Sequence, residues 1–288
     1  MLAICISGAL RNFGEVWPVN EKIFQETGIP FKIFMHTWTQ DFSTTRKVHR
    51  DINWLELNKT LKPKKYKEFD GVVSFSKIKN IIPLSTLLLE DFTEDDICSE
   101  FQIPPKHKTQ LYQGILNSTA MYVGMSKCFN MATIDPEFYK FTHFVRVRTD
   151  FLLKKSIPPE VFLSDLYFGG PGVAMETGYV SDQFFIMKKD FISVICKLPK
   201  FITNHVKENG WQSDSGYTFY AERILSASLK NFRLQHNIIS EPIVGEIKRP
   251  QIVSNAELSQ IFHLKGLFRH NLTVIKRQLI QLLKKLLL

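Results

Sequence analysis

The sequence predicts an α/β protein whose central sheet is mostly parallel and flanked by helices, followed by a C-terminal amphipathic helix. Two observations support this class. At the start of the chain a short apolar run, a small-residue turn, a helical segment and a second apolar run follow one another, which is typical of an α/β unit with parallel strands. The 288 residues are 44% hydrophobic and 23% charged. This composition is typical of a globular protein and excludes a disordered, collagen-like or purely coiled-coil chain.

Apolar runs of strand length alternate with helical segments through the first half of the chain. The expected elements are a strand over residues 2–6, a helix around 16–24, a strand over 31–35, a polar and basic surface excursion over 39–70 and a strand over 72–75. Residues 80–108 contain prolines and an acidic patch, so we expect an irregular connection there.

Apolar positions at helical spacing, with few helix-breaking residues, predict a long helix over residues 112–132 with one buried face. The segments expected after it are a strand over 141–153, strands over 165–168 and 184–187 on either side of a glycine-rich turn, and helices over 190–207 and 215–230.

We expect one domain over residues 1–257 and a separate tail over residues 258–288. No linker divides the body, and its length suits a single large domain. The apolar start has no basic segment before it, so we interpret it as a buried strand and not as a signal peptide. No apolar run reaches the roughly 20 residues that cross a bilayer. The four scattered cysteines, without a CxxC pair, favour a reducing cytoplasm.

The strand that ends near Asp150 carries the most informative pattern. Side chains alternate between the two faces of a strand, so Arg146, Arg148 and Asp150 share one face. Charged groups inside a parallel sheet are costly unless they have partners. α/β sheets bind ligands at the carboxyl ends of their strands, and the guanidinium fork suits phosphate. We interpret the strand as a binding element for an anionic, diphosphate-bearing substrate; the alternative is an edge strand whose arginines pair with surface acids.

Two further segments are expected at the same edge of the sheet. Ser7 and Gly8 follow the first strand and would let a ligand approach the backbone, while Arg11 would add positive charge. The spacing matches neither GxGxxG nor a P-loop, so a turn glycine and a surface arginine are the alternative. His36 and Trp38 end the second strand, where Trp38 could stack on a base or sugar ring and His36 could be structural.

Two carboxylates are candidates for catalysis. Asp182 follows the glycine-rich turn and could accept hydrogen bonds from sugar hydroxyls, or it could cap a turn. Glu222 stands in an otherwise apolar helical segment, where it could act as a general base or could pair with a nearby basic residue on the helix surface.

Four segments together resemble a family of bacterial polysaccharide and lipopolysaccharide biosynthesis glycosyltransferases with a glycosyltransferase-A-like fold. They are residues 4–13 with Trp17 following, 34–38, 145–150 and 181–185. The resemblance implies transfer of a sugar from a nucleotide-sugar donor to a lipid-linked or cell-surface glycan acceptor. Asp182 and Glu222 are then the candidates for the base that an inverting reaction would need. The alternative is a non-catalytic membrane- or glycan-binding subunit of an envelope assembly.

The resemblance also implies a divalent metal, although this chain departs from the pattern. In the wider fold an Asp-x-Asp holds the metal against the donor diphosphate, whereas here Arg148-Thr149-Asp150 offers one carboxylate. Either Asp150 anchors Mg²⁺ or Mn²⁺ with the phosphates as the other ligands, or Arg146 and Arg148 supply the charge. The arginines could replace the metal, because two opposite unit charges about 4 Å apart attract by about 4 kcal/mol at an effective dielectric constant near 20, before the cost of desolvation.

The tail contains six of the nine excess positive charges of the chain, and the last acidic residue is Glu257. Because the body is close to neutral, we expect no nucleic-acid partner. Apolar residues recur every three or four positions from Leu264, which predicts an amphipathic helix on an anionic membrane surface. A coiled coil between subunits or a helix packed on the body are the alternatives. The membrane interpretation implies a cytoplasmic protein at the inner face of the membrane. The basic residues expected to contact it are Lys265, Arg269, Lys276, Arg277, Lys284 and Lys285.

Overall fold

The computed structural model describes residues 1–10, 13–39, 75–82, 86–91, 93–103, 112–169, 180–210, 221–231, 238–239 and 245–247. The chain divides into two compact units, Met1–Leu61 with Tyr66–Arg249 and Lys62–Lys65 with Pro250–Leu288. Every described residue belongs to the first unit. Within these ranges no helix is long and apolar enough to cross a membrane.

The described strands form a seven-stranded sheet in the order β3-β2-β1-β4-β7-β6-β8 and a separate antiparallel pair, β5 with β9. In the large sheet β7 alone runs antiparallel to its neighbours β4 and β6, and the other pairs are parallel. The strands are β1 (Leu2–Ser7), β2 (Phe31–Trp38), β3 (Thr86–Glu90), β4 (His143–Arg148), β5 (Phe151–Leu153), β6 (Leu166–Gly169), β7 (Phe184–Lys188), β8 (Ile238–Ile239) and β9 (Gly245–Ile247).

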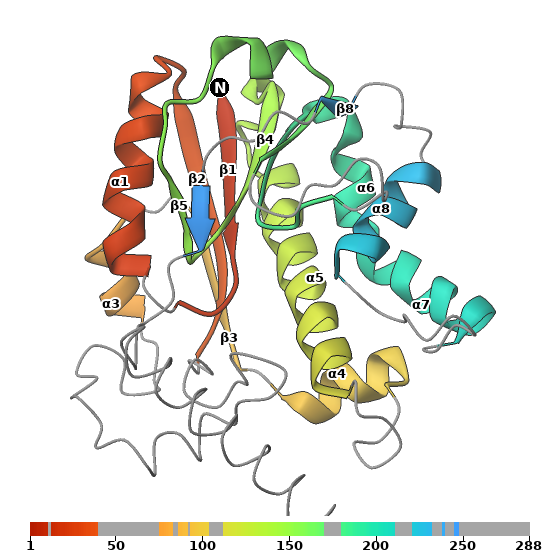
Figure 1. Cartoon of the computed structure of the whole chain (residues 1–288). Coiled ribbons are helices and arrows are strands. Elements are labelled where there is room, and N and C mark those ends of the chain that lie inside the picture. Colours follow the sequence, from red (N-terminus) through yellow and green to blue (C-terminus); the bar gives the residue numbers. More distant parts are fainter. Residues whose placement is uncertain are drawn as a thin grey trace, which may run out of the picture. The chain divides into compact units, whose positions relative to one another are not determined.

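Helices cover both faces of the sheet, with α1 on one side and α5 to α8 on the other (Figure 1). The α-helices are α1 (Phe13–Glu26), α3 (Phe75–Lys79), α4 (Glu94–Phe101), α5 (Tyr112–Thr133), α6 (Ile192–Cys196), α7 (Leu198–Asn209) and α8 (Ala221–Asn231). The short 3-10 helices among the described residues are η3 (Phe138–Lys140), η4 (Pro159–Leu163) and η6 (Lys189–Phe191). The predicted α/β class, with a mostly parallel sheet between helices, is confirmed; the predicted tail helix lies outside the described residues.

The two faces of β1 belong to two separate hydrophobic cores. Ile4 and Ile6 point toward α1, where Trp17 is fully buried. Cys5, on the opposite face, belongs to the core that α5 covers. A strand that is buried on both faces is expected to be apolar throughout, and burying its side chains removes apolar surface from water at about 25 cal/mol per Å². The sheet is therefore held in place from both sides at the strand that leads to Ser7.

A buried asparagine ties α1 to the chain beyond β4. Asn20 donates from Nδ2 to the carbonyl of Phe151 at 2.7 Å and accepts from the amide of Leu153 at 2.8 Å. Both backbone groups belong to β5, which begins directly after Asp150. The amide side chain thus satisfies two backbone groups that are buried against α1.

The strand expected over residues 141–153 is interrupted. β4 ends at Arg148, the chain turns at Thr149 and Asp150, and Phe151 then pairs with Ile247 of β9 in the second sheet. The hydroxyl of Thr149 donates to the carbonyl of Ala9, which holds the turn against the loop after β1. The apolar residues on both sides of the turn, Val147 before it and Phe151 after it, made the segment look like one strand.

The connection expected to be irregular contains two elements instead. Leu87, Leu88 and Leu89 lie in β3, which pairs with β2, and α4 follows it. The acidic patch over residues 94–96 forms the first turn of α4, where negative charge interacts favourably with the helix dipole. Phe75, expected in a strand, begins α3. Residues 72–74 and 40–70 lie outside the described residues.

Candidate functional site

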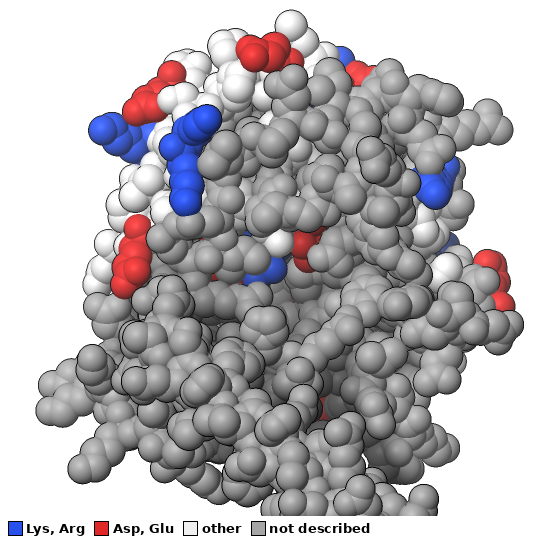
Figure 2. Space-filling view, viewed as in Figure 1, with Lys and Arg blue, Asp and Glu red and all other residues white. Residues whose placement is uncertain are grey.

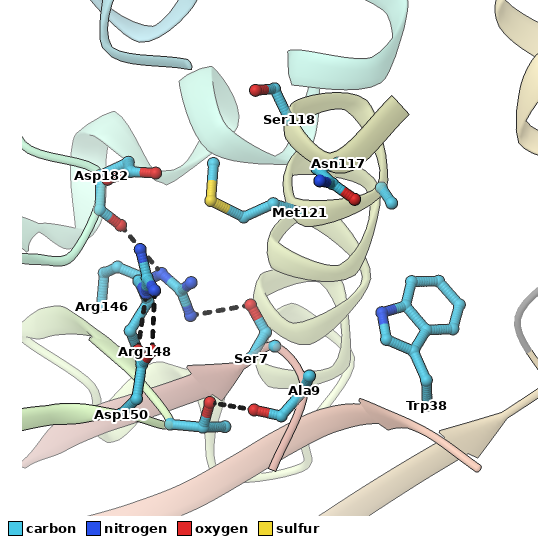
Figure 3. Close-up of a pocket in the computed structure, with 13 residues that line it drawn as sticks. Ser7, Ala9, Trp38, Asn117, Ser118, Met121, Arg146, Arg148, Asp150 and Asp182 are labelled. Carbon is cyan, nitrogen blue, oxygen red and sulfur yellow. Dashed lines mark hydrogen bonds and ion pairs between the residues drawn. The ribbon is translucent and has the colours of Figure 1, made fainter. Parts of the chain in front are cut away.

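The carboxyl ends of three parallel strands meet at one edge of the sheet and form a pocket. The register places Ser7 of β1 opposite His36 of β2 on one side and opposite Arg148 of β4 on the other. Because β7 is antiparallel, the residues just before it, including Asp182, reach the same edge. We call this cavity of about 200 Å³ the strand-end pocket (Figure 3). Its lining is Ser7, Gly8, Ala9, Trp38, Asn117, Ser118, Ala120, Met121, Arg146, Arg148, Thr149, Asp150 and Asp182.

Arg146 is fully buried at the inner wall of the pocket. Its Nη1 donates to the hydroxyl of Ser7 at 2.7 Å and to the carbonyl of Val147 at 3.0 Å, and its Nε donates to the backbone carbonyl of Asp182 at 3.4 Å. Figure 3 shows the guanidinium between Ser7 and Asp182, directed toward the side of the pocket that α5 forms. The arginine is thus held by groups from three separate segments of the chain.

One nitrogen of Arg146 has no hydrogen-bond partner. Nη2 is buried and unpaired among the described residues. Burial lowers the pKa of Arg146 to about 10, against the opposing effect of the Asp182 carboxylate, so the guanidinium remains protonated at neutral pH. A buried charged donor without a partner costs about 1–3 kcal/mol or more. Because Arg146 also lines the pocket, an anionic ligand there would place negative charge next to this guanidinium.

Arg148 and Asp150 form a two-point ion pair beside Arg146. The Nε and Nη2 of Arg148 donate to the two carboxylate oxygens of Asp150, each at 2.8 Å. Asp150 is fully buried, whereas the side chain of Arg148 is 16% exposed. The carboxylate therefore fixes the orientation of a guanidinium that still reaches the pocket.

The loop after β1 approaches this charged group closely because it contains Gly8. Gly8 has a φ of 132°, a backbone conformation that favours glycine, and a Cβ there would lie 3.3 Å from the hydroxyl of Thr149. The Gly8 amide donates to the carbonyl of His36 at 3.3 Å, and its carbonyl accepts from the hydroxyl of Thr37 at 2.8 Å. These contacts fix the floor of the pocket next to Ser7.

The pocket also has polar groups on two facing sides, from Asp182 on one side and from α5 on the other. Asn117 and Ser118 lie on the first turns of α5, next to Met121, and Asp182 lies across the cavity from them (Figure 3). Carboxylate, amide and hydroxyl groups suit the hydroxyl groups of a sugar, since together they donate and accept hydrogen bonds. The sequence analysis did not select Asn117, Ser118 or Thr149, because α5 contains other polar residues and nothing in its pattern distinguishes Asn117 and Ser118.

His36 is buried beside the pocket and does not line it. Its Nε2 lies 2.9 Å from Oε2 of Glu90, which also accepts from Lys127 at 2.6 Å. Burial lowers the pKa of His36 despite the opposing effect of Glu90, so the neutral ring donates its Nε2 proton to the carboxylate. A Cβ on Gly124 would lie 2.8 Å from Nδ1, so α5 passes the imidazole closely at a glycine.

Trp38 lines the strand-end pocket and also a second cavity of about 360 Å³. Its indole packs edge-on against His36, with ring centroids 4.7 Å apart. The second cavity is bordered by Glu90, Lys127 and acidic residues of α4. One aromatic side chain therefore lines both an arginine-containing pocket and an acidic one.

The structure brings together seven of the residues predicted from the sequence. Ser7, Gly8, Trp38, Arg146, Arg148, Asp150 and Asp182 line the strand-end pocket. Arg11 and the six basic residues of the tail lie outside the described residues, and Glu222 lies on α8 at a position whose side chain is not described. In Figure 2, some basic and acidic surface is visible near the centre of the face shown.

The comparisons with known proteins give distant structural similarity and no match by sequence. No family model matches the chain, and no curated protein matches it. The chain is similar to the crystal structure of a glycosyltransferase involved in the glycosylation of the major capsid of PBCV-1. The two have 12% sequence identity and a TM-score of 0.37, over 84% of this chain and 81% of that one. A similarity this distant assigns neither a family nor an activity to the chain.

Proposed function

We propose that this chain is a glycosyltransferase that binds the diphosphate of a nucleotide-sugar donor in the strand-end pocket. The observation that carries the proposal is Arg146, a protonated and fully buried guanidinium that lines the pocket and has one nitrogen without a hydrogen-bond partner among the described residues. Anionic oxygen atoms are the partners that such a group binds most strongly, because charge-assisted hydrogen bonds are short and strong. Arg148, oriented by Asp150, offers a second guanidinium in the same cavity.

The sugar of the donor would lie toward Asp182 and α5. The Asp182 carboxylate, the amide of Asn117 and the hydroxyl of Ser118 could bind its hydroxyl groups, and Trp38 could pack against a ring of the donor or the acceptor. Asp182 is our candidate for the base that deprotonates the acceptor hydroxyl in an inverting reaction, and Glu222 is the second candidate.

The acceptor and the location belong to the same proposal. We propose a lipid-linked or cell-surface glycan as the acceptor, and a protein that works in the cytoplasm at the inner face of the membrane. The basic, amphipathic pattern of residues 258–288 supports this, because such a helix binds anionic lipid through its charges and its leucines.

Nucleoside diphosphates test the donor site directly. A ligand present at 100 times its Kd adds about 2.7 kcal/mol of stability, which raises the Tm of a domain of this size by about 5–10 °C. We expect one nucleoside diphosphate from a panel to produce this shift in the wild-type chain and little shift in Arg146→Met. Lys188→Met, which removes a cation paired with Asp165 away from the pocket, is the control and is expected to keep the shift.

Catalysis is tested by incubating the chain with nucleotide sugars and measuring release of the nucleoside diphosphate. A transferase releases it from one donor, faster when a suitable acceptor is added. Binding without release in any condition would favour the non-catalytic subunit instead. If no nucleoside diphosphate shifts the Tm of the wild-type chain, the proposed donor site is wrong.

A further inference from the structure

We infer that Asp150 acts on the donor diphosphate through Arg148 and not through a divalent metal, so that Asp150 is a positioning residue for a guanidinium ligand. This inference rests on the proposed function, since it concerns how the strand-end pocket binds the diphosphate. It departs from the metal role that the resemblance to glycosyltransferases implies for this position.

The geometry of the ion pair is the first argument. Both oxygens of Asp150 accept from Arg148 at 2.8 Å, in the parallel two-point arrangement that a guanidinium and a carboxylate favour. A divalent cation bound to the same oxygens would lie beside the guanidinium, and like charges at that distance repel each other. Metal binding at Asp150 would therefore have to break the pair and turn Arg148 away.

The surroundings of Asp150 are the second argument. The residue is fully buried in the turn after β4, and Thr149 beside it is fixed to the carbonyl of Ala9. In the described part of the chain no group of three or more histidine, cysteine, aspartate or glutamate side chains could hold a metal ion. Asp182 is the other described carboxylate of the pocket, and the charge of Arg146 lies next to it. The described donor groups therefore suit an anion better than they suit a metal.

Arg146 is the third argument, since it offers what a metal would otherwise provide. Its charge is buried, held by Ser7 and by the backbone of Asp182, and its Nη2 is unpaired among the described residues. With Arg148 held by Asp150, two guanidinium groups are oriented before the ligand arrives. An oriented donor loses little entropy on binding, which favours phosphate recognition without a cation.

Inorganic pyrophosphate is the probe, and its binding is measured by calorimetry with EDTA or with Mg²⁺. We compare the wild-type chain with Arg148→Met, Asp150→Asn and the double variant. Arg148→Met is expected to weaken binding about 10-fold or more, because it removes charge-assisted hydrogen bonds. If Asp150 acts through Arg148, the double variant binds no more weakly than Arg148→Met. EDTA leaves the wild-type affinity unchanged.

Two further variants control the interpretation. Asp165→Asn breaks the pair with Lys188, at 2.6 Å, away from the pocket, and should leave pyrophosphate affinity unchanged. Asp182→Asn removes the other described pocket carboxylate and should not weaken pyrophosphate binding. Since the double variant removes both charges together, it leaves no buried carboxylate unpaired, and its melting curve verifies that it folds.

The outcomes separate the inference from the proposed function. Binding in EDTA, with a double variant equal to Arg148→Met, supports the inference. Binding that requires Mg²⁺ and is abolished by Asp150→Asn or Asp182→Asn overturns it and leaves the donor site intact. Effects of Arg148→Met and Asp150→Asn that multiply in the double variant also overturn it. If neither pyrophosphate nor any nucleoside diphosphate binds, with or without metal, both the inference about Asp150 and the proposed function are wrong.

Discussion

His36 shows how one buried residue couples the sheet to the helix that covers it. Its imidazole donates to Glu90 at the end of β3 and lies against Gly124 of α5. The sequence suggested a donor-binding or a structural role for this histidine. Its full burial and its position outside the pocket lining agree with the structural role.

This arrangement predicts a loss of stability on mild acidification. The pKa of His36 is lowered by burial below its usual value near 6.5, so the unfolded chain takes up a proton first. The stability that His36 contributes is complete above about pH 6.5 and decreases as the pH falls toward the pKa of the folded state. We expect His36→Gln to reduce the slope of unfolding free energy against pH, measured by urea denaturation between pH 7.5 and 5.

Because the measurements stop at pH 5, the titration of Glu90 does not contribute to the slope. Burial acts to raise the pKa of Glu90, but hydrogen bonds from Lys127 and His36 outweigh it, so the pKa lies below 4.5 and its titration begins at more acidic pH. His205→Gln, on α7, is the control for removing a histidine. An equal slope in the wild-type chain and His36→Gln would show that His36 does not titrate in this way.

At the scale of elements, the contact between α1 and β5 fixes the path of the backbone after β4. β4 cannot continue past Arg148 because Thr149 and Asp150 turn toward β1, and Asn20 then holds the backbone that follows. The fixed turn keeps Asp150 buried beside Arg148. A helix on one face of the sheet thus supports charged side chains at the strand ends.

Asn20→Ala tests this support. The substitution leaves the carbonyl of Phe151 and the amide of Leu153 without their buried partner, so we expect a loss of about 2–4 kcal/mol. Asn130→Ala on the exposed side of α5 is the control and should change stability by less than about 0.5 kcal/mol. Both are measured as unfolding free energies in urea. A loss as small as that of the control would show that water replaces the asparagine without cost.

At the scale of the whole molecule, the α/β class and the position of the pocket follow from local patterns. β1, β2 and the long helix α5 were predictable from the sequence. In each of them the apolar residues follow the pattern of that element over the length that such an element usually has. The placement of Ser7 and Arg148 at one edge followed from the rule that ligands bind at the carboxyl ends of parallel strands. These predictions needed no knowledge of long-range contacts.

The remaining features depend on tertiary contacts that no local pattern contains. The pairing of Arg148 with Asp150 requires the turn at Thr149, which a distant carbonyl of Ala9 holds. β3 was missed because its three leucines lie between prolines and acidic residues, and only pairing with β2 identifies the strand. The burial of Nη2 of Arg146 without a partner in the part of the chain that the structure describes also depends on tertiary packing.

The basic tail, residues 258–288, gives a prediction about membrane binding. Residues 258–288 lie outside the described residues, so the membrane role of their basic side chains remains a prediction from sequence. We expect deletion of residues 262–288 to release the protein from anionic vesicles in a sedimentation assay, because six positive charges are removed. Vesicles of neutral lipid are the control. Unchanged sedimentation with anionic vesicles would contradict the prediction.

The position of Trp38 between two cavities has a practical consequence. An indole changes its fluorescence when its surroundings change, and this side chain borders both the arginine-containing pocket and the acidic cavity. Trp17, by contrast, is part of α1, and its side chain is buried in the core and lines neither cavity. In a variant that keeps Trp38 and has its other three tryptophans replaced by phenylalanine, the emission would therefore report a ligand binding in either cavity.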